Sequence, residues 1–376
     1  MDFLAISSDG KKLISASSWD KTIRSWVINT SLEMQEVREH AGYASTMAFF
    51  NTGKKLVSGS YDTTLRVWDV GTGLELQKLE GHIGIVNTCS IFEEKMASGS
   101  EDKSIRIWDL KTYKEIHQLN GHRSGVTALI FLPNGKRLVS GSKDCTIRIW
   151  DLDKGQEIQE PKFNNTYKEG PINILTLIDD GKRLVSGSRN ATICIWNIDT
   201  GQKLQQIERT LHQQLQSLTV ILNERKVALA GGREGPVVQD QIISIVDFEG
   251  KDETRELIGH TDTIFGLAVF KNGKRLASAS RDTTIRFWDL ETRTQIFVLR
   301  HFIPLSSLAI FNDKILCAGD TSGGLWMWKL HLQANSIKPE LLWTTHPGLS
   351  CDQAEISQAV GLSEANRQLM IQHGAK

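Results

Sequence analysis

The stretch SGSYDTTLRVWDV, Ser58–Val70, is repeated along the chain, and this repetition decides the fold. Further close copies end at Trp26, Trp108, Trp150, Trp196 and Trp288, and weaker copies end at Val246 and Trp328. The successive end points lie 42, 40, 42, 46, 50, 42 and 40 residues apart. A period of about 40–45 residues with Trp-Asp endings is typical of propellers built from four-stranded blades.

Each unit has the pattern of four short β-strands. One unit begins with the β-rich run VTALIFL (126–132), turns at PNGK (133–136) and continues with RLVSGS (137–142). Glycine in the turn supplies the positive φ that a tight hairpin needs. The run TIRIW (146–150) then alternates as a strand does, and a fourth run completes the unit, as EIHQL (115–119) does in the preceding one. Radial packing of such sheets would bury the apolar residues of both faces.

These units resemble the repeats of the WD-repeat β-propeller family, and the resemblance covers roughly residues 1–346. Four units keep the literal Trp-Asp pair: Trp68–Asp69, Trp108–Asp109, Trp150–Asp151 and Trp288–Asp289. Six units carry an Asp or Asn six residues before the Trp: Asp20, Asp62, Asp102, Asp144, Asn190 and Asp282. The resemblance implies that this residue, a histidine, a strand Ser or Thr and the Trp form a buried hydrogen-bonded network. The histidines are His40, His82, His122 and His260, each 20–22 residues before its Asp.

The distribution of these histidines favours a structural role over a metal or catalytic site. Each histidine belongs to a different unit and has its own Asp and Trp. Buried polar groups need hydrogen-bond partners, and such a network provides them while it holds a loop against its blade.

The number of units favours an eight-bladed ring over a seven-bladed one, because all eight supply four plausible strands. The family usually closes its ring by borrowing an N-terminal strand for the last blade. Here the last unit finds its own fourth strand in ELLWTTH (340–346), so we expect closure by blade-to-blade packing alone. The first unit lacks a Gly-His loop, which suggests that the chain was cut from a longer one.

Residues 347–376 break the repeat. The run SEANRQLMIQHG (363–374) predicts a short helix with Ser363 as its N-cap and Gly374 after its end. We therefore divide the chain into a propeller (1–346) and a tail with a short helix (347–376).

The composition argues against several classes of protein. The 376 residues include 44 basic and 44 acidic side chains, a balance that is unusual for proteins that bind nucleic acid or a membrane surface. The five cysteines are far apart and have no metal-site spacing, which favours reduced intracellular thiols. Neither a signal peptide nor a run of about 18 apolar residues is present, so we predict a cytoplasmic location.

Candidate binding residues come from two loop positions in each unit. The resemblance implies that partners dock on the face that carries the second turn and the loop before the first strand. The residue before each turn Asp or Asn is Trp19, Tyr61, Glu101, Lys143, Arg189 or Arg281. The matching positions in the other loop are Tyr43 and Ser45, Ile85 and Asn87, Gly125 and Thr127, Pro171 and Asn173, and Thr263 and Phe265.

Exposed aromatic residues flanked by Arg are typical of binding hot spots. The first three units would present Trp19, Tyr43, Tyr61 and Ile85 together, and later units would present Lys143, Arg189 and Arg281. We predict that partners bind to Trp19, Tyr43, Tyr61, Ile85, Glu101, Lys143, Arg189, Phe265 and Arg281. The alternative is that one or two of these rings lie over neighbouring loops.

A second candidate site lies on the opposite face. The first turns carry the basic pairs Lys11–Lys12, Lys54–Lys55, Lys136–Arg137, Lys182–Arg183 and Lys274–Arg275, which would suit an adaptor for anionic lipid or nucleic acid. Loops on the same side carry Glu75, Asp153, Asp199 and Glu291, which would cancel much of this charge. Solvated turn residues are therefore the favoured interpretation.

Catalysis is the third possibility and has the least support. The sequence contains no nucleophile elbow, no phosphate-binding glycine loop and no metal-spaced His/Glu pair, so we predict no cofactor and no enzymatic role. The leading hypothesis is a monomeric, non-catalytic scaffold that binds a protein or peptide on the face of Trp19 and Tyr61. The similarity of the repeats to one another also suits the sensor arm of a larger signalling assembly.

Overall fold

Each repeat unit folds into one antiparallel sheet whose strands are neighbours in chain order. The computed structural model describes residues 3–6, 12–17, 22–27, 40–158, 163, 170–207, 214–221, 226–232, 241–247, 255–271, 273–333 and 336–345, the first three ranges as backbone alone. Among these residues, the only helical segments are two short 3-10 helices, η1 (Asn51–Gly53) and η2 (Asp179–Gly181). No helix in this part of the chain is long and apolar enough to cross a membrane.

The first sheet has three strands: β1 (Phe3–Ile6), β2 (Lys12–Ser17) and β3 (Thr22–Val27). The other seven sheets have four strands each: β4 (Ala44–Phe50), β5 (Lys55–Ser60), β6 (Leu65–Asp69) and β7 (Glu75–Leu79); β8 (Val86–Phe92), β9 (Lys95–Ser100), β10 (Ile105–Asp109) and β11 (Lys114–Leu119); β12 (Val126–Phe131), β13 (Arg137–Ser142), β14 (Ile147–Asp151) and β15 (Gln156–Ile158); β16 (Ile172–Ile178), β17 (Arg183–Ser188), β18 (Ile193–Asn197) and β19 (Lys203–Ile207); β20 (Gln214–Ile221), β21 (Lys226–Gly232), β22 (Ile242–Asp247) and β23 (Arg255–Ile258); β24 (Ile264–Phe270), β25 (Arg275–Ser280), β26 (Thr284–Asp289) and β27 (Thr294–Arg300); β28 (Leu305–Phe311), β29 (Ile315–Asp320), β30 (Leu325–Leu332) and β31 (Ile337–Thr344).

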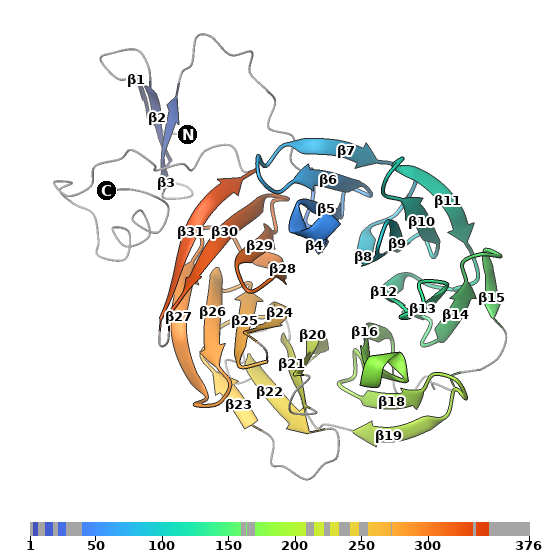
Figure 1. The fold of residues 1–376 in the computed structure, drawn as a ribbon. Coiled ribbons are helices and arrows are strands. Elements are labelled where there is room, and N and C mark those ends of the chain that lie inside the picture. The colour runs from blue at the N-terminus through green and yellow to red at the C-terminus, as the bar shows by residue number, and fades with distance from the viewer. Residues whose placement is uncertain are drawn as a thin grey trace.

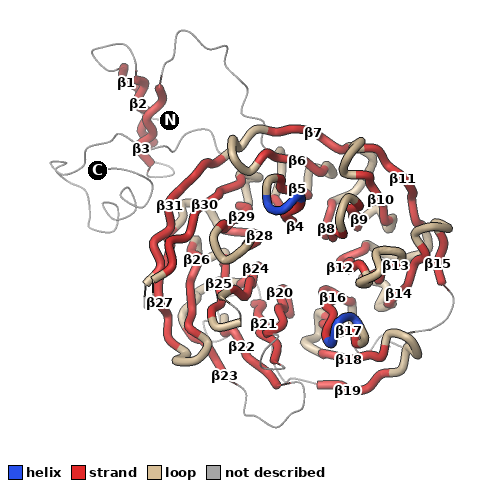
Figure 2. Tube along the Cα trace, in the orientation of Figure 1, coloured by secondary structure: helices blue, strands red, loops and turns tan. Residues whose placement is uncertain are grey.

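The seven four-stranded sheets are the blades of a ring (Figure 1). The first strand of each blade lies nearest the centre and the fourth lies at the rim, as the tube in Figure 2 also shows. The second strands β5, β9, β13 and β17 are buried along almost their whole length. The prediction of an all-β propeller with four-stranded blades is therefore confirmed.

The preference for eight blades was wrong, because the ring closes between the last sheet and the sheet of the second repeat. Strand β28 packs directly against β4. The hydroxyls of Ser306 and Ser307 both donate to the carbonyl of Ala44, at 2.8 and 2.7 Å, and Trp343 Nε1 donates to the carbonyl of Val70 at 2.7 Å. Among the described residues the first repeat contributes three strands, which Figure 1 shows outside the ring.

Among the strands that the structure describes, none is exchanged to close the ring. The fourth strand of the last blade, β31, comes from its own repeat and pairs with β30. This agrees with the expectation of closure by packing. The predicted tail helix and the proposed boundary between 346 and 347 lie outside the described residues.

Small residues in the second strand let neighbouring blades approach closely. A Cβ atom at Gly141 would lie 2.4 Å from Ile172 Cγ2 of the next blade. At the closing seam, a Cβ atom at Gly319 would lie 2.8 Å from Ala44 Cβ. The seam therefore uses the same type of contact as the blade pairs inside the ring, which explains why seven blades close without a special joint.

A four-residue network holds the core of the β8–β11 blade. Trp108 Nε1 donates to Ser98 Oγ at 2.8 Å, Ser98 Oγ lies 2.8 Å from His82 Nε2, and His82 Nδ1 lies 2.8 Å from Asp102 Oδ2. The same connections at 2.7–3.0 Å occur in three other blades: His40, Ser58, Asp62 and Trp68; His122, Ser140, Asp144 and Trp150; and His260, Ser278, Asp282 and Trp288. The network joins a loop to two strands in each of these blades.

The chemistry of the network assigns the protons of its histidine. Because Trp288 donates to Ser278, the serine hydroxyl is left to donate to His260 Nε2, and His260 Nδ1–H then donates to Asp282. Burial lowers the pKa of His260, which keeps its ring neutral. Burial alone would raise the pKa of Asp282, but the hydrogen bonds from His260 and Thr284 outweigh burial and lower this pKa to about 2.

The last blade uses a different buried network. Asp320 stands at the end of β29, and its carboxylate accepts from Trp326 Nε1 at 2.8 Å and from the backbone N–H of Gly324 at 2.9 Å. Trp328 pairs with Leu316 and occupies the repeated Trp position, but the position of the network serine is taken by Ala318. Among the described residues the buried Nε1 of Trp328 has no hydrogen-bond partner.

Replacing Ala318 by serine is expected to raise the free energy of unfolding by about 1–2 kcal/mol, since a buried donor gains its acceptor. The new hydroxyl would stand where Ser58 accepts from Trp68 Nε1 in the first blade of the ring. Urea denaturation followed by tryptophan fluorescence measures the difference. Ala97→Ser places the same hydroxyl at another fully buried alanine and is expected to destabilise the protein; equal effects of the two changes would contradict the assignment.

Candidate functional site

A repeated backbone hydrogen bond brings the two predicted loop positions together on one face of the ring. In the β4–β7 blade the N–H of Tyr61 donates to the carbonyl of Tyr43 at 3.0 Å. Five other blades have the same bond at 2.8–2.9 Å: Glu101 to Ile85, Lys143 to Gly125, Arg189 to Pro171, Arg281 to Thr263 and Thr321 to Pro304. The side chains of the two series therefore lie around the same opening.

A β-bulge in the first strand of every blade aims one side chain at the centre of the ring. In β4 the pairing passes from Ala44–Ser60 to Thr46–Gly59, so that Ser45 has no partner in the ladder. Bulges of this kind redirect single side chains. The bulged residues of the seven blades are Ser45, Asn87, Thr127, Asn173, Gln216, Phe265 and Ser306.

Polar bulge residues also connect several neighbouring blades. Asn87 Nδ2 donates to the carbonyl of Val126 at 3.0 Å, and Asn173 Nδ2 donates to the carbonyl of Leu215 at 2.8 Å. The hydroxyl of Ser45 donates to the carbonyl of Val86 in the same way. The inner wall is therefore fixed by inter-blade hydrogen bonds and needs little rearrangement to receive a ligand.

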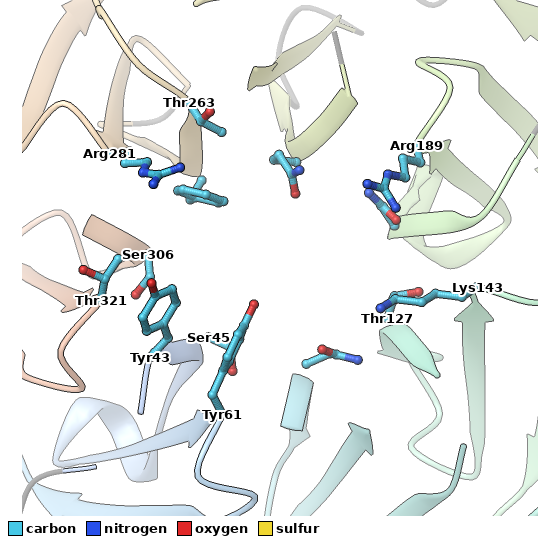
Figure 3. Close-up of a pocket in the computed structure, with 14 residues that line it drawn as sticks. Tyr43, Ser45, Tyr61, Thr127, Lys143, Arg189, Thr263, Arg281, Ser306 and Thr321 are labelled. Carbon is cyan, nitrogen blue, oxygen red and sulfur yellow. The ribbon is translucent and has the colours of Figure 1, made fainter. Parts of the chain in front are cut away.

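These residues line a central cavity of about 660 Å³ (Figure 3). Its walls combine the seven bulge residues with the loop series, as follows: Tyr43, Ser45, Tyr61, Asn87, Thr127, Lys143, Asn173, Arg189, Gln216, Thr263, Phe265, Arg281, Ser306 and Thr321. Six of the predicted binding residues are among them: Tyr43, Tyr61, Lys143, Arg189, Phe265 and Arg281. A cavity of this size with convergent polar groups is the usual form of a ligand site.

Two tyrosines form an aromatic platform at the edge of the cavity. The rings of Tyr43 and Tyr61 stack with centroids 5.0 Å apart and an interplanar angle of 27°. The residues are 45% and 47% exposed, which leaves about half of their surface for a partner. Burial and the nearby Tyr43 and Glu101 raise the pKa of Tyr61, so its hydroxyl keeps its proton and can donate a hydrogen bond at neutral pH.

The charged residues of the cavity are all basic. Lys143, Arg189 and Arg281 come from three different blades, and no carboxylate is among the lining residues. Arg189 and Arg281 belong to the blades on either side of the β20–β23 blade. Just behind this lining, Lys143 Nζ pairs with Glu101 Oε1 at 2.5 Å.

Three of the predicted binding residues are not placed in the cavity wall. Glu101 pairs with Lys143 and accepts from Asn87 Nδ2 at 2.8 Å, so it supports the wall from behind. Ile85 provides the carbonyl that Glu101 N–H contacts, and its side chain is not among the lining residues. Trp19 lies outside the described residues, and its role stays a prediction.

Gln216, Ser306 and Thr321 line the cavity but were missed by the sequence analysis. They belong to the two units that depart most from the repeat; in the last unit Thr321 and Ser322 stand where other units have a charged residue followed by Asp. The signal that would have found Gln216 and Ser306 is the first strand itself, because each follows the first apolar residue of its run, as Asn87 follows Val86.

Several of the basic turn residues on the opposite face are already engaged within the protein. Lys55 Nζ donates to the Tyr113 hydroxyl at 2.7 Å, and Arg183 pairs with Asp179. Arg275 is only 1% exposed and donates to the carbonyl of Gln333 at 2.8 Å. These contacts reduce the number of cations that this face offers to a phosphate.

The remaining reactive groups are the cysteine thiols and the side chains that could bind a metal ion. The described cysteines Cys89, Cys145, Cys194 and Cys317 form no disulfide with one another, and Cys351 lies outside the described residues. Within the described ranges no group of three or more His, Cys, Asp or Glu side chains could hold a metal ion.

A comparison with known protein families finds one whose model matches this chain. The family model described as WD domain, G-beta repeat matches residues 3–26, 32–69, 73–109, 113–151, 162–197 and 251–289, which together make up more than half of the chain. The two units that end at Val246 and Trp328 are not matched. They are also the units in which the sequence pattern is weakest.

Individual relatives match only part of the chain. THO complex subunit 6 of Homo sapiens is 26% identical over 134 residues, which are 33% of this chain and 36% of that protein. The small ribosomal subunit protein RACK1 of Candida albicans is 29% identical over 87 residues, or 23% of this chain and 27% of that protein. WD repeat-containing protein 55 of Bos taurus is 29% identical over 109 residues, or 28% and 27%. The chain spans about a third of the length of THO complex subunit 6 from the mammals it matches.

Proposed function

Because the chain belongs to the WD-repeat family, we propose that it is a non-catalytic scaffold that binds a protein or peptide over the central cavity, on the face of Tyr43 and Tyr61. The observation that carries this proposal is the half-exposed tyrosine stack at the edge of a cavity whose wall is already hydrogen-bonded. Tyr and Arg are the residue types that most often dominate binding energy at protein interfaces.

The relatives are consistent with a role in an assembly. By their names, THO complex subunit 6 and the small ribosomal subunit protein RACK1 are components of larger complexes. We propose that the present chain also acts as a recognition part of a larger assembly. The predicted cytoplasmic location and monomeric ring belong to this proposal, and Trp19 remains a predicted additional contact.

The double substitution Tyr43→Ala/Tyr61→Ala is expected to remove most partner binding while the propeller stays folded. Removing two central aromatic anchors commonly costs about 2–4 kcal/mol of binding free energy, or roughly 30- to 1000-fold in affinity. The measurement is affinity capture from lysate with quantitative mass spectrometry, in which wild type and variant are compared at equal protein concentration.

The matched control removes two apolar side chains of similar exposure from the outermost strands, Leu76→Ala and Leu204→Ala, which are 43% and 48% exposed in the wild type. This variant is expected to retain the captured proteins. If the tyrosine variant retained the same proteins in the same amounts as the control, the proposed binding face would be wrong.

A further inference from the structure

We propose that the central cavity binds an acidic segment of its partner protein, with carboxylates facing Lys143, Arg189 and Arg281 and an adjacent apolar residue packed on the Tyr43–Tyr61 stack. This inference rests on the proposed function and names the chemistry of the partner. It follows from the charge of the cavity wall, the placement of its cations and the hydrogen-bonding groups between them.

The charge of the cavity differs from that of the whole chain. The protein has 44 basic and 44 acidic residues, yet the lining includes three cations and no carboxylate. Lys143 also pairs with Glu101. A concave lining whose charged side chains are all basic favours a ligand of the opposite sign, because the low-dielectric walls concentrate the field.

The placement of the cations fits an extended ligand. Figure 3 shows the tyrosines on one side of the opening, Lys143 and Arg189 on the opposite side, and Arg281 across the opening from Arg189. Three cations on three blades match several carboxylates along a segment better than they match one compact phosphate, which Arg clusters recognise at a single point. The tyrosine stack adds an apolar surface at one end of this path.

The uncharged wall residues favour a polypeptide. Both hydrogens of the Asn87 amide are used, toward Glu101 and Val126, so its Oδ1 is the atom left to contact a ligand. An amide oxygen accepts hydrogen bonds from peptide N–H groups, whereas a phosphodiester backbone has no donor to offer. Nucleic-acid binding also takes most of its affinity from phosphate contacts, of which three cations can make only a few.

A selection from a phage-displayed library of random 12-residue peptides tests the proposal. Peptides retained by the wild-type protein are expected to be enriched in Asp and Glu, with an aromatic or aliphatic residue close by. A fluorescein-labelled synthetic peptide from this selection then serves as the probe in fluorescence anisotropy. Its counterpart with Asn and Gln in place of Asp and Glu is expected to bind at least roughly tenfold more weakly.

The charge-reversal variant Arg189→Glu/Arg281→Glu is expected to bind the acidic probe with an affinity that is lower by roughly 100-fold or more. In a repeated selection, this variant is expected to retain Lys- and Arg-rich peptides instead of acidic ones. The matched control is Lys136→Glu/Lys182→Glu, which changes the net charge equally at exposed positions in the first turns. It is expected to alter affinity less than about threefold, because screening removes most long-range effects at physiological ionic strength.

The possible results separate the two proposals. Selected peptides that are not acidic but are lost with Tyr43→Ala/Tyr61→Ala would overturn the acidic preference and leave the binding face intact. Tighter binding of a phosphopeptide or of a 20-nucleotide single-stranded RNA than of the acidic probe would also overturn it. If no selected peptide depended on the tyrosines or the arginines, both proposals would fall.

Discussion

The substitution Asp282→Asn is expected to lower the free energy of unfolding by about 3 kcal/mol at pH 7, although it changes only one side-chain oxygen to an amide nitrogen. Asp282 Oδ2 accepts from His260 Nδ1 at 2.7 Å and from the N–H of Thr261 at 3.1 Å. Its Oδ1 accepts from the N–H and the hydroxyl of Thr284 at 2.9 and 2.6 Å. An asparagine would turn its NH2 group toward one of these pairs of donors, and at least one N–H would lose its acceptor.

The effect of Asp282→Asn is expected to depend on pH. The network holds the pKa of Asp282 at about 2, below the ordinary value of 3.8 for an Asp carboxyl in an unfolded chain. A carboxyl group whose folded pKa is depressed contributes stability above the unfolded pKa and loses it as the pH falls through the folded pKa. The difference between wild type and variant should therefore be full near pH 7 and shrink between about pH 4 and pH 2.

Guanidinium denaturation at pH 7, 5, 4 and 3 measures this difference. Asp153→Asn, at an exposed turn residue, removes the same charge without touching the network and is expected to change stability by less than about 0.5 kcal/mol at each pH. A loss that did not depend on pH would show that the Asp282 carboxylate does not carry the stabilisation.

The network also explains why so much of the fold could be predicted from the sequence. Its members stand on a loop and two strands, and a strand that slipped by one residue would turn its Ser or Trp to the other face. Each unit must therefore keep its Ser, Asp and Trp at fixed spacing, and the repeat was visible for this reason. In the β16–β19 blade the turn residue is Asn190, and Trp196 still donates to Ser186 at 2.8 Å, so part of the pattern survived there.

The number of blades could not be obtained in this way. A network inside a unit says nothing about which two units meet when the ring closes. That is decided by contacts such as Ser307 with Ala44, between residues 263 positions apart. One of the two units that meet there, the last, has Asp320 and Trp326 in place of the usual network, so its structure was harder to interpret from the repeat.

In the candidate site too, the repeat predicted the positions of residues but not their contacts with neighbouring blades. The repeat located Tyr61, Lys143, Arg189 and Arg281 at equivalent positions, because one backbone hydrogen bond recurs in their blades. It could not show that Glu101, at the same position, would pair with Lys143 of the next blade. Which side chain compensates which charge depends on the packing of neighbouring blades.

The closing seam leads to the second large expected effect. Gly323→Ala is expected to lower the free energy of unfolding by about 3–5 kcal/mol, the sum of backbone strain and overpacking. Gly323 has a φ of +98°, which alanine adopts only with strain. Its Cβ would lie 2.2 Å from the carbonyl oxygen of His40 and 2.7 Å from that of Gly42, so the loop that carries His40 must move.

Movement of that loop would weaken the contacts of His40 with Ser58 and Asp62, at 2.7 and 2.9 Å, and the damage should therefore be concentrated at the seam. Denaturation measures the loss of unfolding free energy, and hydrogen exchange shows which strands are affected. The backbone amides of β4, β5 and β28–β31 should exchange faster, while those of β12–β15 should be little changed. Gly71→Ala is the control, because the atom nearest to a Cβ added at Gly71, Asp69 Oδ1, is 3.4 Å away and the φ of Gly71 is not positive.

Uniformly faster exchange around the ring, or equal stability of the two variants, would contradict a seam between the last blade and the blade of the second repeat. Faster exchange confined to the seam would show that the ring opens where its two ends meet, since no exchanged strand holds them together.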